Sequence, residues 1–337
     1  MTIKLNRRTF GKVALGGAVA AVPLARPAFA QGKTLRLSHH LAPGHLVDVA
    51  SHRFAELVAE ATGGSVAVEV FPSGQIAGLR QGAEAVQLGT VDVVWSDFGT
   101  LANWRPEYGF VSLPFMFAGD DHFEAVISGD VGAELADSVR SNLGIDTLGF
   151  GNAGFRVVAT RDTPVNGPDD LAGIRIRVPE VPVFVSAFEA VGANPTPMAW
   201  GEVYTALQTG VIDAVENPAE GLVSGGMQEV TNHLSRTLHI MTDVNLFANG
   251  GVMAGLTEDE RAAVQASAAT AVAEFNEGTR NASTEHWNTL AATMEVIEEP
   301  DRAAFQAAMA PVWDGFTAAV GDAGQHWIDV VTAAKPA

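Results

Sequence analysis

Three arginines lie within apolar segments that have the pattern of β-strands. Arg175 and Arg177 flank Ile176, and Arg156 stands near the start of another apolar segment at residues 155–160. Residues two apart in a strand share a face, and a buried arginine is costly unless an anion pairs with it. The pattern therefore allows two interpretations: a structural ion pair, or a guanidinium that binds a ligand carboxylate through paired hydrogen bonds.

Four histidines gather early in the chain, at His39, His40, His45 and His52. A zinc site would place two or three of them with an acid at fixed helical spacing, as in H-E-x-x-H, and this spacing does not occur. We therefore predict no metal site. The histidines are interpreted as surface or cavity-rim residues, with His39 or His40, at the end of the first predicted strand, as candidates for ligand contact.

A glycine-rich segment at residues 149–154 matches G-x-G-x-x-G and follows an apparent strand. In dinucleotide-binding proteins this motif opens a helix, so that the pyrophosphate meets free N–H groups. Here a strand-like sequence follows at residues 155–160, which disfavours a dinucleotide site. We predict that the glycines form a crossing between two lobes and that the protein uses no cofactor.

Other signatures of enzymes are weak. The patterns G-x-S-x-G and G-x-x-x-x-G-K-[ST] do not occur in the sequence, which removes common hydrolase and phosphate-binding motifs. The paired acids at residues 120–121 and 169–170 lie at predicted helix starts, where capping explains them. The chain has no cysteine, so disulfides, thiolate metal sites and cysteine nucleophiles are excluded. No catalytic group is predicted.

The first thirty residues have the order of an export signal. Arg7 and Arg8 stand in a twin-arginine pattern, an apolar run follows at residues 13–22, and Ala28-Phe29-Ala30 matches a cleavage site. The run is too short for a stable membrane anchor. We therefore expect a twin-arginine signal peptide over residues 1–30 and a periplasmic mature chain. No later segment is apolar enough for stable membrane insertion.

Charge and length narrow the class of protein further. A chain of 337 residues favours two domains. Removing the five basic residues of segment 1–30 from the totals of 20 basic and 39 acidic residues leaves a net charge of −24. Such a surface repels nucleic acid and anionic lipid. An anionic ligand must therefore be held by locally placed arginines.

Hydrophobic periodicity predicts alternating strands and helices. The first part reads as strands at 35–38, 66–70 and 91–95 with helices at 46–61 and 79–88, and the second part has strands at 155–160, 174–178 and 211–215, helices at 181–191 and 200–209, and an extended piece at 194–197.

A long helix is predicted near the carboxyl end of the chain. Thr257 and Glu260 form a capping box at its start, and the helical pattern continues to about residue 293. At ~1.5 Å per residue its length is roughly 50 Å, more than one lobe is wide. We expect it to brace both lobes, with a break near Gly278 as an alternative.

Several motifs together resemble one family. The most specific are Asp170-Leu-Ala-Gly-Ile-Arg-Ile-Arg-Val-Pro-Glu180, Glu202-Val-Tyr-Thr-Ala-Leu-Gln-Thr-Gly210 and Glu216-Asn217-Pro218. The chain resembles the solute-binding subunits of TRAP transporters in their dicarboxylate-binding, DctP-like branch. The resemblance implies an α/β, two-lobe periplasmic binding protein fold (type II-like), with mixed sheets flanked by helices and a long helix that braces both lobes.

The resemblance also implies how the chain is divided. Lobe I would comprise residues 31–153 with about 243–281, and lobe II residues 154–242 with about 282–337. The ligand cleft would lie between them. The implied partners are a small organic acid and the membrane permease subunits. An exported α/β enzyme, a binding protein of another transporter class and a sensor subunit are the alternatives.

Site residues follow from positions that match the family motifs. Arg177 matches the arginine that grips the ligand carboxylate, Arg156 a second basic residue, and Asn217 the asparagine after the hinge strand. Trp200 falls where the family has an aromatic over the ligand. The ligand-binding candidates are Arg177, Arg156, Asn217, Trp200, His39 and Trp95.

Three positions depart from the family pattern. Leu79 stands where a glutamate is common, Val215 where a glutamine is common, and Ala153 where an asparagine is common. If these residues face the cleft, they favour a less hydroxylated ligand than a sugar acid. The sequence leaves dicarboxylates, 2-oxo acids, aromatic acids and sugar acids open, because each offers a carboxylate to Arg177.

Overall fold

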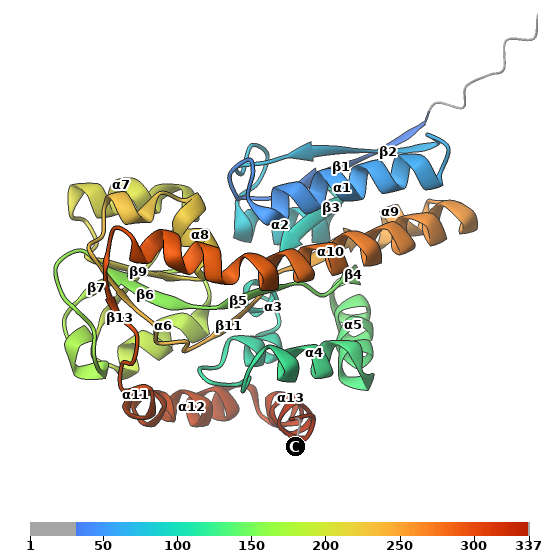
Figure 1. The fold of residues 1–337 in the computed structure, drawn as a ribbon. Helices are drawn as coiled ribbons and strands as arrows, with labels where there is room; N and C mark the ends of the chain where they lie inside the picture. The colour runs from blue at the N-terminus through green and yellow to red at the C-terminus, as the bar shows by residue number, and fades with distance from the viewer. Residues whose placement is uncertain (1–31, 336–337) are drawn as a thin grey trace, which may run out of the picture. The chain divides into compact units, whose positions relative to one another are not determined.

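A computed structural model describes residues 32–335, and the predicted signal peptide at 1–30 lies outside these residues. Strands and helices of the described part form two larger mixed sheets with helices packed on them (Figure 1). The mixed α/β class expected from the alternating pattern is confirmed.

The first sheet has five strands in the order β2-β1-β3-β12-β4. Its strands are β1 (Lys33–Ser38), β2 (Val66–Phe71), β3 (Val93–Ser96), β4 (Ile145–Gly149) and β12 (Asn245–Asn249). β1 is parallel to β2 and β3, whereas β12 runs antiparallel to β3 and β4. One face packs on α1 (Leu46–Ala61) through residues such as Leu37 and Phe54, and the other packs on α2 (Leu79–Leu88) through Val94 and Val86.

The second sheet has six strands in the order β13-β10-β6-β9-β7-β8. Its strands are β6 (Val157–Thr160), β7 (Arg175–Val178), β8 (Asn194–Pro197), β9 (Ala214–Asn217), β10 (His233–Ser235) and β13 (Glu295–Ile297). Helix α6 (Pro182–Ala190) shares a core cluster with Ile176 and Val178. Helices α7 (Val203–Thr209) and α8 (Ala219–Ser224) share another with Val215. Arg177 lies between Ile176 and Val178 and therefore points away from α6.

A two-stranded ribbon connects the two sheets. β5 (Asn152–Phe155) follows β4, β11 (Met241–Asp243) precedes β12, and the two strands pair antiparallel. The predicted strand at 155–160 is thus two strands, β5 and β6, which are interrupted at Arg156. The glycine-rich segment is followed by a strand and not by a helix, as we expected.

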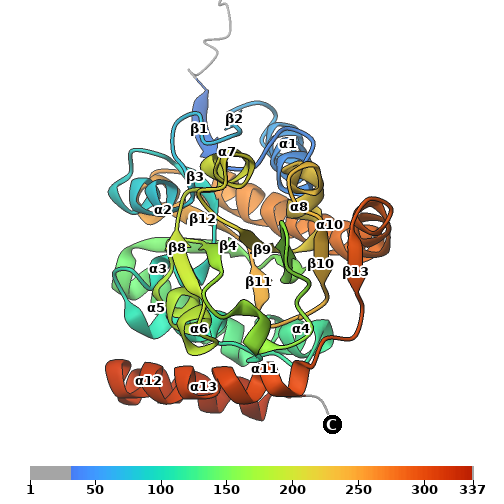
Figure 2. The same ribbon diagram turned by 90° about the vertical axis from the view of Figure 1, so that its left-hand side faces the viewer.

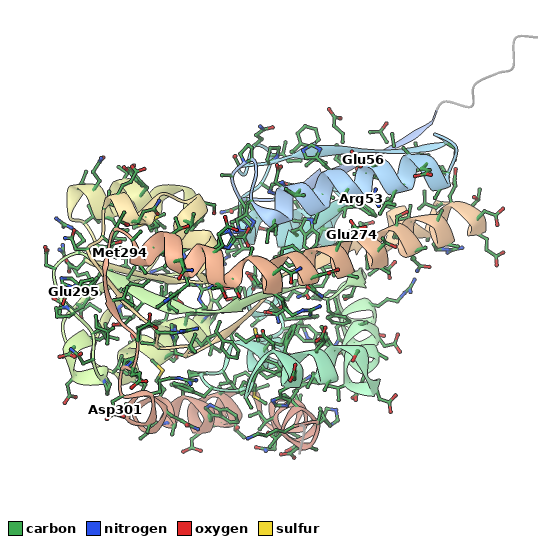
Figure 3. The ribbon with its side chains drawn as sticks, in the orientation of Figure 1. Arg53, Glu56, Glu274, Met294, Glu295 and Asp301 are labelled. Carbon is green, nitrogen blue, oxygen red and sulfur yellow. The ribbon has the colours of Figure 1, made fainter. Side chains whose placement is uncertain are left out.

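The long helix α10 spans Glu258–Ala291 without a break at Gly278. Its first half buries Val264 and Ala268 beside the first sheet, and Leu290 near its end packs in a cluster of the second sheet. Arg53 of α1 donates to Glu274 of α10, with a distance of 2.9 Å from Nε to Oε2 (Figure 3). The helix therefore contacts both sheets.

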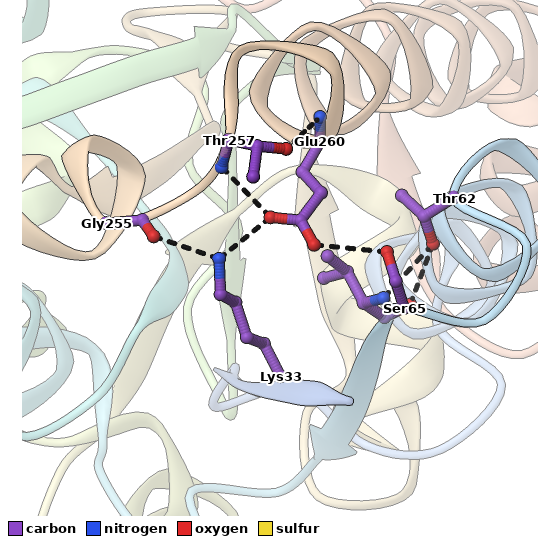
Figure 4. Close-up of polar contacts among 7 residues, drawn as sticks. Lys33, Thr62, Ser65, Gly255, Thr257 and Glu260 are labelled. Atoms are coloured by element: carbon purple, nitrogen blue, oxygen red, sulfur yellow. Dashed lines mark hydrogen bonds and ion pairs between the residues drawn. The ribbon is translucent and has the colours of Figure 1, made fainter. Parts of the chain in front are cut away.

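The start of α10 is joined to β1 and to the turn before β2 (Figure 4). Thr257 accepts from the Glu260 backbone N–H, and Glu260 Oε2 accepts from the Thr257 N–H at 2.9 Å. Lys33 Nζ donates to Glu260 Oε2 at 2.8 Å, and Ser65 Oγ donates to Oε1 at 3.1 Å. The predicted capping box is present and the carboxylate of Glu260 serves three donors.

Further elements complete the fold, and the sequence patterns did not predict most of them; three lie where helix starts at residues 120–121 and 169–170 and a helix at 200–209 were predicted. The carboxyl-terminal helices pack along one edge of the molecule (Figure 2), and Trp327 stacks on Phe110 with ring centroids 5.3 Å apart. These elements and the remaining short helices are α3 (Phe98–Leu101), η1 (Pro106–Ser112), α4 (Asp120–Ser128), α5 (Asp130–Leu143), η2 (Pro168–Leu171), η3 (Trp200–Glu202), η4 (Met227–Glu229), α9 (Gly250–Ala254), α11 (Arg302–Met309), α12 (Pro311–Val320) and α13 (Asp322–Ala333).

Within residues 32–335, no helix has the length and apolar character needed to cross a membrane.

Replacing Thr257 tests the role of the cap. We expect Thr257→Ala to lower the free energy of unfolding by about 1 kcal/mol, because an N-cap acceptor for α10 is lost. Urea unfolding followed by circular dichroism measures the change. Thr257→Ser keeps the acceptor and should stay close to wild type. Equal losses in both variants would contradict the assignment.

Candidate functional site

A cavity lies where loops of the first sheet, loops of the second sheet and the connecting ribbon meet. Its wall includes His40 and Asp97 from the first group, Arg177 and Asn217 from the second, and Thr242 from the ribbon. The empty space is about 800 Å³, part of it open to solvent. The concave wall combines polar and apolar side chains, which is typical of a site for a small organic ligand.

Arg177 supplies a buried positive charge to this cavity. The residue is 4% exposed, and its Nε and Nη2 donate to the carbonyl of Met198 at 3.0 and 2.7 Å. Within residues 32–335 it forms no ion pair, and burial lowers its pKa to about 9 because the charged form loses its hydration. The wall thus holds a guanidinium whose charge no carboxylate balances directly.

Arg156 lies in the same wall but is already paired. It donates through Nη2 to Oε1 of Glu216 at 2.7 Å and through Nε to Oε2, and Nη1 donates to Thr242 Oγ1 at 3.0 Å. Glu216 is fully buried, and His239 Nε2 lies 3.3 Å from its Oε2. Arg156 therefore matches the structural ion pair interpretation, although it still borders the cavity.

Arg175 forms a structural ion pair, which is one of the two interpretations that the sequence allowed. It is exposed at the start of β7 and pairs with Asp213, with Nε 2.8 Å from Oδ2. Of the two arginines on β7, only Arg177, two residues further along the strand, reaches the cavity. The two arginines of β7 therefore have different environments: Arg175 forms an ion pair at the surface, and Arg177 is buried.

Trp200 and Asn217 also line the cavity. The centroid of the Trp200 ring lies 5.3 Å from Cζ of Arg177, a cation–π distance. Asn217 is the last residue of β9 and lies close to Gly221 of α8. If Gly221 carried a Cβ, that atom would be only 3.0 Å from Asn217 Cγ, so the glycine makes room for the asparagine side chain. The structure thus brings four of the six sequence candidates to one cavity.

The other two candidates, His39 and Trp95, are not in the cavity wall. His39 continues the alternation of Leu35 and Leu37 toward α1, and its Nε2 lies 3.2 Å from Asp48 Oδ1. Trp95 is fully buried and packs on Phe275, with ring centroids 5.5 Å apart. Strand alternation explains both positions, because each side chain faces the helices that cover the first sheet.

Of the two histidines that the sequence offered for ligand contact, His39 and His40, it is His40 that lines the cavity. Its Nδ1 is buried without a hydrogen-bond partner in the described part of the chain. Burial, together with the charges of His39 and Arg177, lowers the pKa of His40 to about 3. His40 is therefore neutral at physiological pH. No three His, Asp or Glu residues between 32 and 335 are arranged to hold a metal ion.

Three carboxyl groups of the wall were missed by the sequence analysis. Asp97 is the N-cap of α3, Asp243 ends β11, and Glu220 lies in α8. Asp97 follows β3 directly and lies two residues after the strand predicted at 91–95, which is a usual position for a ligand contact in α/β sheets. Asp243 and Glu220 carry no comparable signal, because their positions depend on the ribbon and on α8.

Glu220 joins the two groups of elements that form the cavity. Its Oε1 accepts from the backbone N–H of Leu46, at the start of α1, at 2.7 Å. His45 Nδ1 lies 3.4 Å from the same oxygen, but burial lowers the pKa of His45 to about 3, so this ring is neutral. Burial raises the pKa of Glu220 to about 7.

Comparison with known proteins places this chain in a family. The model of the bacterial extracellular solute-binding protein family 7, DctP, matches residues 37–319. A solute-binding protein of Roseobacter denitrificans is 36% identical over 282 residues, which cover 83% of this chain and 86% of that protein.

Two solved structures extend the likeness. One is a TRAP periplasmic solute-binding protein from Roseobacter denitrificans with bound β-D-glucuronate, with a TM-score of 0.86 and 30% sequence identity. The match covers 89% of this chain and 99% of the chain in that structure. The other is a TRAP periplasmic solute-binding protein from Sulfurospirillum deleyianum with bound succinate, with a TM-score of 0.84 and 27% sequence identity. The match covers 90% of this chain and 99% of the chain in that structure.

The fold and cavity define a two-lobe periplasmic binding protein of the α/β class. The chain belongs to solute-binding protein family 7, the DctP family of TRAP transporters. The members of this family are binding proteins and not enzymes.

Glu220 should give the stability of the protein a measurable pH dependence. Its folded-state pKa, about 7, lies above the ordinary glutamate pKa of 4.5, so its contribution to stability is full below pH 4.5 and is lost as the pH rises through 7. The loss should be on the order of 3 kcal/mol.

Unfolding free energies from pH 4.5 to 8 measure this effect in wild type and Glu220→Gln. The difference between the two proteins should change by that amount over the interval. Glu84→Gln, at an exposed position of α2, should keep the wild-type profile. A pH-independent difference between Glu220→Gln and wild type would contradict the assignment.

Proposed function

We propose that this protein binds a small carboxylate in the described cavity and delivers it to the membrane permease of a TRAP transporter. Arg177 anchors the ligand carboxylate through paired hydrogen bonds. Trp200 packs against both the guanidinium and the ligand body, and Asn217 orients the bound acid. Arg156, held by Glu216, shapes the wall.

The observation that carries this proposal is the buried, unpaired guanidinium of Arg177. A buried charge without an opposite charge is unfavourable, so an entering carboxylate gains more here than at any solvated arginine. The overall negative charge of the chain repels anions at long range. Binding therefore depends on this local site and on the desolvated wall around it.

Closure of two lobes on the ligand is the mechanism we propose. The cavity wall combines residues next to the first sheet with residues next to the second, and β5, β11 and α10 connect the two. A ligand that contacts both groups favours the closed arrangement, because only closure makes both sets of contacts. The permease would then recognise the closed form.

The relatives indicate the chemical range of the ligand. One binds β-D-glucuronate and another succinate, and both compounds carry a carboxylate. Of the three departures from the family pattern, Leu79 and Ala153 line the cavity, whereas Val215 is buried and does not. The apolar contributions of Leu79 and Ala153 favour a ligand with an apolar body.

A thermal-shift screen of organic acids tests the carboxylate anchor. A ligand that binds only the native state adds about 2.7 kcal/mol of stability at a hundredfold excess over its Kd. We expect Arg177→Ala to lose the Tm shifts that acids cause in wild type. Arg175→Ala, which breaks an exposed pair on the same strand, should keep them. A retained shift in Arg177→Ala would contradict the proposal.

Export through the twin-arginine pathway is part of the proposal. It is supported by the order of basic, apolar and small residues in segment 1–30. Replacing both Arg7 and Arg8 by lysine should leave the precursor in the cytoplasm, because the paired arginines identify the signal. Fractionation of cells that express each form measures this. Unchanged periplasmic yield would argue for another export route.

A further inference from the structure

The acids Asp97, Asp243 and Glu220 form a second polar region of the cavity wall, which we call the acidic wall. They come from three separate elements, α3, β11 and α8. In residues 32–335 none of them forms an ion pair with lysine or arginine, in contrast to Glu216, which pairs with Arg156. The acidic charges that act on the pKa of Arg177 come from Glu216 and Glu180 and not from these three residues.

Glu220 shows most directly that the acidic wall lacks a hydrogen-bond donor. The residue is 7% exposed. Its Oε1 accepts from Leu46, whereas its Oε2 is buried without a hydrogen-bond partner in the described part of the chain. A buried acceptor without a donor is unfavourable. Because Glu220 lines the cavity, a donor group on a ligand would remove this cost.

Asp97 and Asp243 meet at the start of α3. Asp97 Oδ1 accepts from the Thr100 N–H at 2.5 Å, and Asp243 Oδ2 accepts from the Phe98 N–H at 2.9 Å. Asn245 also donates to Asp243 Oδ2, at 2.5 Å. Burial raises the pKa of both acids, and the charge of Asp97 contributes to raising that of Asp243 to about 7. These contacts fix both carboxyls without forming an ion pair, and the positive charge that acts to lower the pKa of Asp97 is that of Arg156, which already pairs with Glu216.

The charges of the cavity limit what a ligand can carry. Arg177 offers one positive charge without a direct partner, and the charge of Arg156 is balanced by Glu216. A second ligand carboxylate would have to lie near the acidic wall, where like charges repel strongly because little water screens them. A hydroxyl or ammonium group would instead donate a charge-assisted hydrogen bond to an ionised acid.

We propose that Asp97, Asp243 and Glu220 select ligands with one carboxylate and, at a distance from it, a hydroxyl or ammonium donor, and that they exclude dicarboxylates. This inference rests on the proposed function, since it takes Arg177 as the carboxylate anchor. Leu79 leaves part of the wall apolar, so the ligand needs only a few donors. The protein would then differ in specificity from its succinate-binding relative.

Titration calorimetry with ligands of equal carbon number tests the selection. The probes are 4-hydroxybutanoate, 4-aminobutanoate, butanoate and succinate, measured on the mature protein at pH 8. We expect the better of the two donor-bearing acids to bind at least tenfold more tightly than succinate and than butanoate. The hydroxyl and ammonium probes identify the donor. Succinate that binds equally well, or no binding of either donor-bearing acid, would overturn the inference.

Variants assign the preference to the acidic wall. Asp243→Asn and Asp97→Asn should each reduce the preference over succinate at least fivefold, because each removes a negative charge while keeping a similar shape. Glu84→Gln, at the surface, should leave it unchanged. Circular dichroism confirms folding of each variant, and the comparison of ligands on wild type stands without them. An unchanged preference in both folded variants would overturn the assignment.

Arg177→Ala separates failure of this inference from failure of the proposed function. If the acids bind the Arg177→Ala variant as tightly as wild type, the carboxylate anchor and the inference both fail. If binding requires Arg177 but succinate binds as well as the donor-bearing acids, the anchor stands and only the selection by the acidic wall fails.

Discussion

The buried guanidinium of Arg177 is the constraint on which the site depends. Its two hydrogen bonds go to the carbonyl of Met198, and Trp200 lies at a cation–π distance. These neutral partners hold the side chain without cancelling its charge. The position is kept by β7, because Ile176 and Val178 are buried on the opposite face of the strand. The sheet thus fixes the position of a guanidinium whose charge a bound carboxylate can balance.

The other charged groups near the cavity are arranged so that this one stays free. Glu216, which precedes Asn217 in β9, is fully buried. It pairs with Arg156 and lies within hydrogen-bond distance of His239. Separating the two partners of such a buried pair would leave an uncompensated charge. This cost keeps Glu216 with Arg156. Asp213 binds Arg175 at the surface. Arg177 therefore has no competing carboxylate partner among the described residues.

The sequence predicted much of the fold because its strands and helices have clear periods. The cap of α10 and the helix at residues 46–61 are examples. The strand predicted at 211–215 is found at Ala214–Asn217, since Val211 is exposed after the turn at Gly210. Site residues on strands and their ends, such as Arg177 and Asn217, could be recognised from motifs. Asp243 and Glu220 could not, because tertiary packing alone brings them to the cavity.

The most direct test of the central claim compares a ligand acid with its primary amide. The two have nearly the same size and differ in the negative charge that Arg177 is proposed to bind. Titration calorimetry should show the amide binding wild type at least a hundredfold more weakly than the acid, about 2.7 kcal/mol, and Arg177→Ala should remove most of this difference. Equal affinities of acid and amide for the wild-type protein would contradict the account.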